Sequence, residues 1–490
     1  MGTDVGNLVK LTNLIDQEKW ERSSKYILVE SYLLKIIQSG AFQDNDKLPS
    51  IRKLSADLCV SKNTVIRAYQ ELEAQGYVYA LPKSGYRVSV RTKLDTMLME
   101  PTCVDLLSLC KDILSYPEYK ECLPLGSAHP NINAPAIKSL YAEIGRHSRQ
   151  QVYTSSHYQL PPGNKLLVKQ LAKITQDLGI SASTDDLLVT HGAQQSISLA
   201  LRAMTRSGDI VAVESPCYFG NLLLLESLGL KVIEIPSCSR EGISPEALEQ
   251  AMKTWDIKVI IVTPNFTNPT GAVMPLKRRQ KLLSISSNIP IIEDDVFGAL
   301  AHGTPLPSLY SLDIQKRVIY VNSLSKTLDS RLRIGWILAG KYREKIEKYL
   351  LCDNMGCLNL LHSGVATFLT SGKYRTHTSK MIRNYQSQVQ YFCLLLNKVL
   401  SKYENVKNRY QIHKTQGSFL LWIRLPKGTD SYELYRECNQ HKISILPGTV
   451  FGSHNQYKHC FRVSVANFDC DNDWLPAMEV FGRLISQHVN

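Results

Sequence analysis

Apolar residues in the first part of the chain recur at helical spacing in three short segments. A first helix is predicted over residues 26–39, with its apolar side chains gathered on one side. Ser50 and Ser61 stand where each can cap a further helix that has one apolar face. Two short strands are predicted next, at 77–81 and 86–90, on either side of a turn. This order predicts a helix-turn-helix followed by a two-stranded wing.

From about residue 125 the pattern changes to apolar runs that alternate with helical segments. The predicted strands are Leu187–Thr190, Ile210–Glu214, Lys231–Ile235, Lys258–Thr263, Pro290–Glu293, Val318–Val321 and Ile334–Ala339. Such alternation predicts a mostly parallel, doubly wound sheet with helices on both faces. In such a sheet, ligands bind at the carboxyl ends of the strands. A long helical stretch then leads into a smaller α+β part, with strands predicted at 418–424, 443–446 and 460–465.

These changes predict a multidomain protein, which agrees with a length of 490 residues. Residues 1–92 are expected to form the winged helix-turn-helix domain, and 93–123 a linker with one short amphipathic segment. Residues 124–490 are expected to form the α/β domain. Its large subdomain would cover about 150–340 and its small α+β subdomain about 341–490.

The composition, with 44% hydrophobic and 21% charged residues, is that of a globular protein. No apolar run is long enough to span a bilayer, and the first twenty residues do not form a secretory signal. The twelve cysteines include no C-x-x-C pair. We therefore expect reduced thiols in a cytoplasmic protein and no metal site.

The net charge of +13 allows a nucleic-acid partner, and the charge is not evenly distributed along the chain. Residues 1–93 hold 14 Lys and Arg against 10 Asp and Glu, so that positive charge is about twice as dense there as in the remainder. A small helical protein-interaction domain would also fit the helices alone. The predicted wing and the basic first turn of the last helix favour DNA.

The stretch from Leu48 to Val90 resembles the DNA-binding domain of GntR-family bacterial regulators, through P-S-I-R, S-K-N-T-V and A-Y-Q-E-L-E-A-Q-G-Y. The resemblance implies that the second helix enters the major groove of double-stranded DNA and that the wing reaches phosphate or the minor groove. The candidate DNA-binding residues are Arg52, Lys62, Asn63, Thr64, Arg67, Lys83, Gly85 and Arg87. Cys59 stands where this turn often has glycine.

The segment from Arg317 to Gly340 carries the candidate chemistry of the second domain. An apolar strand delivers Ser323, Ser325 and Lys326 to its carboxyl end, and Arg333 follows seven residues after the lysine. Burial and a nearby cation lower a lysine pKa, so that the neutral amine can attack an aldehyde. Hydroxyls and a guanidinium can bind the phosphate of the same ligand. S-x-S-K alone would fit a surface lysine equally well.

Four further pieces stand at strand ends in chain order. Ala193 and Gln194 begin a helix, where free backbone N–H groups and the helix dipole attract an anion. Tyr218 could stack on a flat ring, Asn268 lies in an N-P-T-G turn, and Asp294 could pair with a pyridinium nitrogen. Each piece alone also fits a helix cap, a plain turn or an ordinary tyrosine.

Taken together and in this order, the pieces resemble the pyridoxal-phosphate (PLP) site of fold-type-I aminotransferases. The resemblance implies that Lys326 forms an internal aldimine, Asp294 meets the ring nitrogen and Asn268 meets the phenolate. It implies that Tyr218 stacks on the ring and that phosphate is held by Ala193, Gln194, Ser323, Ser325 and Arg333. Arg462 matches the arginine that binds the substrate carboxylate. Tyr158 matches a tyrosine that reaches the phosphate from the neighbouring subunit, which implies a homodimer.

One position departs from the family pattern. The tyrosine that follows the ring aspartate by three residues, and that hydrogen-bonds the phenolate, is replaced here by Phe297. The phenolate therefore lacks one donor. We expect PLP binding to be retained and transaminase turnover to be weak or absent.

A GntR-type winged helix joined to an aminotransferase-like domain resembles the MocR subfamily of bacterial transcriptional regulators. The resemblance covers nearly the whole chain and implies a dimeric, PLP-binding transcription factor. Such a factor would sense an amino acid, an amine or a B6 vitamer through aldimine chemistry. The alternatives are an active PLP-dependent aminotransferase with an accessory DNA-binding domain, and a binding module whose PLP site is vestigial.

Overall fold

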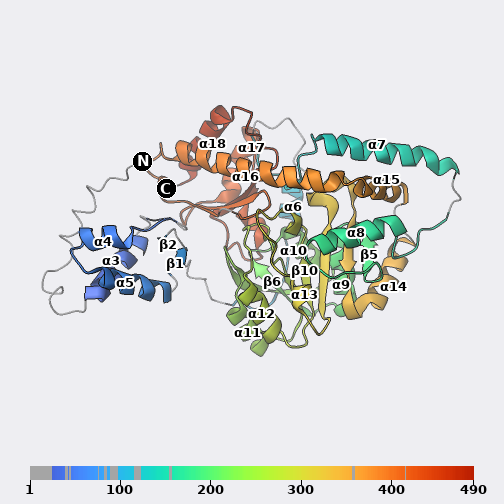
Figure 1. Cartoon of the computed structure of the whole chain (residues 1–490), viewed down its shortest axis with the longest axis horizontal. Helices are drawn as coiled ribbons and strands as arrows, with labels where there is room; N and C mark the ends of the chain where they lie inside the picture. Colours follow the sequence, from blue (N-terminus) through green and yellow to red (C-terminus); the bar gives the residue numbers. More distant parts are fainter. Residues whose placement is uncertain are drawn as a thin grey trace. The chain divides into compact units, whose positions relative to one another are not determined.

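The computed structural model divides the chain into two compact units, Met1–Leu94 and Asp95–Asn490 (Figure 1). The structure describes residues 25–38, 42, 46–74, 77–81, 85–88, 98–114, 123–153, 157–355, 359–413 and 415–489. The architecture confirms the predicted fold class, a winged helix-turn-helix and a fold-type-I aminotransferase-like unit with a small subdomain.

The first unit contains three helices and a two-stranded antiparallel wing among its described residues. They are α3 Lys25–Gln38, α4 Ile51–Asp57, α5 Lys62–Ala74, β1 Val78–Leu81 and β2 Gly85–Val88. Ser50 caps α4 by accepting the N–H of Lys53 at 3.2 Å, and Ser61 caps α5 by accepting the N–H of Thr64 at 3.1 Å. Both capping serines were expected from the sequence.

The core of this unit forms where the three helices and the wing meet. Val29 of α3, Leu54 of α4, and Val65 and Leu72 of α5 are almost fully buried. The ring of Tyr69 stacks on Tyr86 of the wing at 4.5 Å, and its hydroxyl donates to the carbonyl of Pro49 at 2.7 Å. These contacts fix the wing against α5. Cys59 has φ 52°, in the left-handed region that favours glycine, which explains why this turn commonly has glycine.

Among the described residues, the second unit is built on a nine-stranded sheet. Eight strands follow the order β3-β7-β6-β9-β10-β11-β12-β5, and β8 pairs with β7. Its strands are β3 Thr102–Cys103, β5 Leu187–Thr190, β6 Ile210–Ser215, β7 Lys231–Cys238, β8 Gly242–Ile243, β9 Ile257–Val262, β10 Ile291–Asp294, β11 Val318–Ser323 and β12 Gly335–Leu338. Strands β7, β6, β9, β10 and β11 are parallel, whereas β12 is antiparallel to both of its neighbours. Because β12 is antiparallel to both β11 and β5, strand β5 runs in the same direction as β11.

Helices cover both faces of this sheet. Successive residues of β12 show the two faces. Trp336 belongs to a core cluster that includes residues of the helices at 135–150, 165–177 and 359–370, whereas Ile337 belongs to another that includes residues of the helices at 193–204, 343–354 and 373–400. The helices of this unit are α6 Leu107–Leu114, α7 Pro135–Gln150, α8 Lys165–Asp177, α9 Ala193–Met204, α10 Phe219–Ser227, α11 Pro245–Thr254, α12 Leu276–Ile285, α13 Leu309–Leu312, α14 Arg343–Asn354, α15 Asn359–Thr370, α16 Lys373–Leu400, α17 Ser431–Gln440 and α18 Leu475–His488. Burial on both faces explains why the strands read as continuous apolar runs.

The small subdomain follows α16 and contains a four-stranded sheet with the order β13-β14-β17-β16. Its strands are β13 Gln411–His413, β14 Leu420–Arg424, β16 Leu446–Pro447 and β17 Cys460–Ser464. The strand predicted at 443–446 is divided between two sheets. Its first part, β15 Ile443–Ser444, pairs instead with β4 Leu123–Pro124, which comes from 320 residues earlier in the chain.

Part of the predicted linker packs onto the second unit. Val104, Leu106 and Cys110 are buried in its main core, and the N–H of Leu106 donates to the carboxylate of Glu226 at 3.2 Å. Strand β3 joins the main sheet beside β7. In the part of the chain that the structure describes, no helix is both long and apolar enough to cross a membrane.

Candidate functional site

The carboxyl ends of β5, β6, β9, β10 and β11 meet at one edge of the main sheet, around a cavity of about 100 Å³. Nine of the ten predicted cofactor residues line this cavity. They are Ala193, Gln194, Tyr218, Asn268, Asp294, Ser323, Ser325, Lys326 and Arg333. Residues from five separate strand ends therefore meet, as the predicted topology requires.

Lys326 lies at the end of a short 3-10 turn that directly follows β11. Its Nζ donates to the backbone carbonyl of Ala128 at 2.9 Å. Burial, followed by the nearby Arg462 guanidinium, lowers the pKa of the Lys326 amine to about 8. The amine is thus held in position and is neutral in an appreciable fraction of molecules near neutral pH.

Asp294 is the last residue of β10 and is buried at the floor of the cavity. Burial raises the pKa of its carboxyl to about 6, although the backbone N–H of Val296 donates to it at 3.3 Å. A buried carboxylate of this kind is stabilised by a cation that enters the cavity.

Glu214 is a second buried acid at this edge of the sheet, and the sequence analysis missed it. Its Oε1 accepts the N–H of Thr263, and burial raises the pKa of its carboxyl to about 8, with a further contribution from Asp294. The only sequence signal was an acid within the otherwise apolar strand β6. A protonated Glu214 leaves Asp294 as the carboxylate that bears the negative charge.

The predicted phosphate-binding residues form a cradle at the start of α9. Gly192 precedes this helix with φ 86°, and a Cβ at Gly192 would lie 2.5 Å from the guanidinium of Arg333. Ser323 Oγ donates to Ser325 Oγ at 2.9 Å, so the two hydroxyls are adjacent. The first N–H groups of a helix have no partner within the helix. The cradle therefore combines free N–H donors, hydroxyls and a cation.

The other two predicted ring contacts also face the cavity. Tyr218 precedes α10, and Gln194 Nε2 donates to the carbonyl of Gly220 in the first turn of that helix at 2.6 Å. Asn268 is buried, and its side-chain oxygen has no hydrogen-bond partner. A buried polar atom without a partner is costly unless a ligand supplies one.

Arg462 lies on β17 and reaches the large subdomain beside Lys326. Its Nη2 donates to the backbone carbonyl of Gly126, while its buried Nε has no partner. Burial lowers the pKa of the guanidinium to about 10. One loop therefore supplies two carbonyls to the site: that of Gly126 accepts from Arg462, and that of Ala128 accepts from Lys326. The sequence analysis treated that loop only as rich in Pro, Asn and Gly.

Tyr158 and Phe297 differ in their relation to the cavity, which Phe297 lines. The side chain of Tyr158 does not line the cavity and is 76% exposed. Phe297 is buried, with its ring centroid 5.7 Å from Lys326 Nζ, and packs edge-on against Phe419. The aromatic ring of the family tyrosine is therefore retained at this position without its hydroxyl.

The candidate DNA-binding residues occupy different environments in the first unit. Lys62 and Asn63 are exposed in the first turn of α5, whereas the Thr64 hydroxyl is hydrogen-bonded to Ser61. The guanidinium of Arg67 lies 4.0 Å from the centroid of the Tyr26 ring on α3, which restricts its reach. Arg52 on α4 is exposed. On the wing, Gly85 has φ 93° and Arg87 is half-buried, and Lys83 lies outside the described residues.

The cavity residues fit pyridoxal phosphate on their chemistry. Lys326 supplies an amine with a lowered pKa, and Asp294 a buried acid that gains from a pyridinium. The cradle at α9 supplies phosphate donors, and the side-chain amide of Asn268, which lines the cavity, carries N–H groups that can donate to the ring oxygen.

Comparison with known proteins identifies both units. Residues 25–88 match the family of bacterial regulatory proteins called gntR, and residues 131–473 match aminotransferase class I and II. A winged helix-turn-helix followed by an aminotransferase-like domain defines the class of this protein. It belongs to the GntR-type transcriptional regulators with a class I and II aminotransferase domain, the MocR type.

Two relatives from Escherichia coli K12 match almost from end to end. The HTH-type transcriptional regulator YjiR is 34% identical over 95% of this chain and 98% of its own length. The regulator YdcR is 31% identical over 95% of this chain and all of its own length. Both are described as uncharacterized.

Solved aminotransferases share the fold of the second unit. LysN, an α-aminoadipate aminotransferase from Thermus thermophilus, superposes with a TM-score of 0.68 at 23% identity, over 77% of this chain and 94% of its own. A Pyrococcus horikoshii kynurenine aminotransferase superposes with a TM-score of 0.68 at 24% identity, over 82% of this chain and 98% of its own. At these identities the likeness concerns the fold.

Proposed function

We propose that this protein is a PLP-binding transcriptional regulator that senses an amino acid, an amine or a B6 vitamer. The observation that carries the proposal is the cavity in which Lys326, Asp294 and the α9 cradle meet. Regulators with the same two-part organisation match nearly the whole chain, which favours regulation over a purely metabolic role.

The cavity residues have distinct roles in this proposal. When bound, pyridoxal phosphate supplies an aldehyde that captures primary amines reversibly, and an electron-withdrawing ring. Lys326 is the residue that attaches it, and Asp294 keeps the ring nitrogen protonated. Asn268 binds the ring oxygen and Tyr218 covers the ring. Phosphate is held by Ala193, Gln194, Ser323, Ser325 and Arg333, and by Tyr158 of a second copy in a homodimer.

Effector binding uses the loop at Gly126 and the cation beside it. A buried guanidinium with an unpartnered Nε, at Arg462, favours an effector that carries a carboxylate. Lys326 would release the cofactor when the effector's amine binds, and the carbonyl of Ala128 lies within hydrogen-bond distance of the Lys326 Nζ. An amino acid carries both groups: its carboxylate would pair with Arg462, and its amine would take the place of the Lys326 amine.

The signal reaches DNA through linkage. An effector changes DNA affinity only if it binds two arrangements of the protein with different affinity. Two winged helices in a homodimer require an operator with two half-sites, direct or inverted. In this proposal the protein acts in the cytoplasm. In this proposal Lys62, Asn63, Thr64 and Arg67 enter the major groove, with Arg52 beside them and the wing residues on phosphate.

The test follows one sample through two measurements. Candidate amines and amino acids are added to the purified protein while its visible absorption spectrum is recorded. Each compound that shifts the cofactor band is then added to a titration with an operator selected from random duplexes. We expect at least one compound to shift the band and to change the operator affinity, without multiple turnovers in the presence of a 2-oxo acid.

Two variants separate the two halves of this test. Asn63→Ala, at an exposed position of α5, should weaken operator binding and leave the spectral response unchanged. Arg462→Met should abolish the response to amino acids and leave operator binding intact. Repeated turnover of an amino donor would favour the active aminotransferase, which the full set of cavity residues also allows. A band that shifts without any change in operator affinity would contradict sensing.

The pH dependence of cofactor attachment follows from the Lys326 amine. With a pKa of about 8 instead of the usual 10.5, roughly one amine in ten is neutral at pH 7 and half at pH 8. The rate at which apoprotein is covalently modified by pyridoxal phosphate should therefore rise about tenfold from pH 7 and level off above pH 9. Stopped-flow absorbance between pH 6 and 10 measures it. A rate that keeps rising towards pH 10.5, like that of a free lysine amine, would contradict the lowered pKa.

A further inference from the structure

Three helical segments of the aminotransferase-like unit carry most of the net charge of the chain. Helices α7 and α8 and residues 373–383 of α16 together hold ten Lys and Arg against two Asp and Glu, a net charge of +8. The whole chain carries +13. None of these residues has a role in the cavity, so the charge needs another explanation.

The charge is most regular on α8. Lys165, Lys169 and Lys173 are spaced four residues apart, so they lie on one side of the helix, about 6 Å from one to the next along its axis. All three are exposed and have no ion-pair partner among the described residues. Asp177, the one acid of α8, is held by Arg375 at 2.5 Å. The one acid of α8 is therefore paired with Arg375 and not with a lysine of this row.

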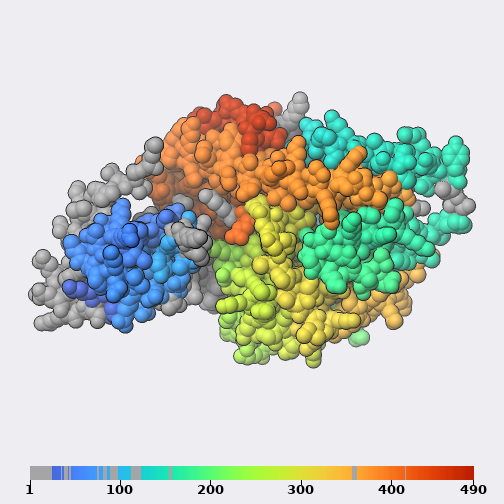
Figure 2. Space-filling view, viewed as in Figure 1, coloured from blue at the N-terminus to red at the C-terminus, as the bar shows by residue number. Residues whose placement is uncertain are grey.

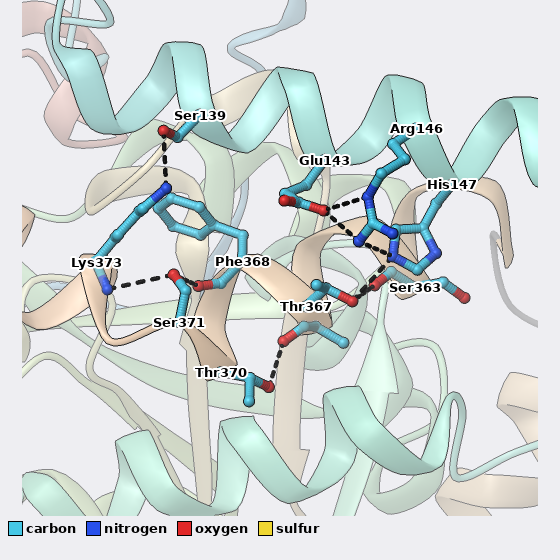
Figure 3. A network of polar contacts seen from close by, with 11 residues as sticks. Ser139, Glu143, Arg146, His147, Ser363, Thr367, Phe368, Thr370, Ser371 and Lys373 are labelled. Carbon is cyan, nitrogen blue, oxygen red and sulfur yellow. Dashed lines mark hydrogen bonds and ion pairs between the residues drawn. The ribbon is translucent and has the colours of Figure 1, made fainter.

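The start of α16 continues this row toward α7. Lys173, Asp177 and Arg375 line one shallow cleft of about 120 Å³. Lys373 precedes Arg375 by two residues, and its Nζ donates to the hydroxyl of Ser139 on α7 at 3.2 Å (Figure 3). Helix α15, which contacts both α7 and α8, contains no charged residue. Figure 2 shows α8 and the first half of α16 side by side on the visible face.

We name these five cations, Lys165, Lys169, Lys173, Lys373 and Arg375, the basic face. We propose that the basic face binds the phosphate backbone of double-stranded DNA, in addition to the winged helix and without reading sequence. Unpaired lysines in a row contact phosphate as point charges, and DNA carries one negative charge per about 1.7 Å of its axis. The inference rests on the proposed DNA-binding function and assigns part of it to the second unit.

The salt dependence of DNA binding tests this. The full-length protein and the variant Lys165→Gln/Lys169→Gln/Lys173→Gln are titrated with a fluorescent duplex of random sequence at several salt concentrations. The plot of log K against log salt has a negative slope, and each lost phosphate contact reduces the magnitude of that slope by about 0.9. The loss of three contacts should therefore reduce it by about 2 to 3. A Lys→Arg variant at the same three positions keeps the charge and should keep the slope.

A charge-matched control comes from another surface of the same unit. Lys277, Lys281 and Lys348 are exposed, and changing all three to Gln removes the same charge. This control should bind as the unaltered protein does. Equal slopes for the α8 variant and the control would overturn the inference. So would loss of binding to phosphatidylserine vesicles by the α8 variant with DNA binding unchanged, which would make the face a membrane surface.

The outcomes also separate this inference from the proposed function. If the unaltered protein binds no duplex, both fail. If it binds duplex and responds to an effector while the α8 variant keeps the full salt slope, the proposed function stands and the basic face does not bind DNA. Thermal unfolding of the α8 variant checks that it is folded, because exposed lysines contribute little to stability.

Discussion

Replacement of Lys326 by Ala is expected to abolish covalent attachment of pyridoxal phosphate completely. Lys326 is the one lysine among the described residues that lines the cavity, and burial lowers the pKa of its amine to about 8, so this amine is the one prepared to react there. The variant should show no visible band after addition of the cofactor. Borohydride followed by mass spectrometry should find no added mass on the protein.

A lysine on the surface of the same unit provides the control. Lys281→Ala, on α12, should retain both the band and the borohydride-fixed mass on Lys326. The Lys326→Ala variant is expected to fold, since it removes a buried amine and leaves only the Ala128 carbonyl without its donor. A fixed cofactor mass on another lysine of the variant would contradict the assignment of the cavity.

Replacement of Asp294 by Ala should cause the second large loss, in affinity for the cofactor. The carboxylate is buried, and the partner proposed for it is the protonated ring nitrogen. Removing one member of a buried charge pair costs about 2–5 kcal/mol. The dissociation constant measured by fluorescence titration should therefore rise by roughly 30-fold to several thousand-fold.

Replacement of Asp294 by Asn should weaken cofactor binding in the same way but should affect stability in the opposite direction. In apoprotein, burial raises the pKa of Asp294 to about 6, above its ordinary value of 3.8. The contribution of this group to stability is therefore largest below pH 4 and is lost as the pH rises through about 6. At pH 8 the isosteric Asp294→Asn should unfold at an equal or higher denaturant concentration than the unaltered apoprotein.

This difference between binding and stability separates a ligand contact from a structural role. Asp185→Ala, at an exposed carboxylate outside the cavity, should change neither quantity. If Asp294→Asn both destabilises the apoprotein and leaves cofactor affinity unchanged, the carboxylate serves the fold and the proposed ring contact is wrong.

Much of the cavity could be predicted because its residues follow strands. The carboxyl ends of parallel strands meet at one edge, so Asn268, Asp294 and Lys326 had to come together once the strands were recognised. The serine caps of α4 and α5 were predictable for a similar reason, since a cap depends on residues within one turn. In both cases the decisive contacts are local or follow from the order of the strands.

Other contacts gave no signal in the sequence because they join residues distant in the chain. The carbonyls of Gly126 and Ala128 contact Arg462 and Lys326, and a carbonyl is present at every residue. The burial that raises the pKa of Glu214 depends on the packing around β6. The stacking of Arg67 on Tyr26 depends on how α3 crosses α5.

The sequence by itself determined the two-part organisation, the order of helices and strands, and the strand ends that carry the cavity residues. These features depend on apolar periodicity and on short motifs, which act over a few residues. The tertiary structure alone decided that the strand predicted at 443–446 is shared between two sheets, and that the start of α16 connects the lysine row of α8 to α7. Pairing and packing between distant segments depend on the complete fold, because no local pattern specifies which surfaces meet.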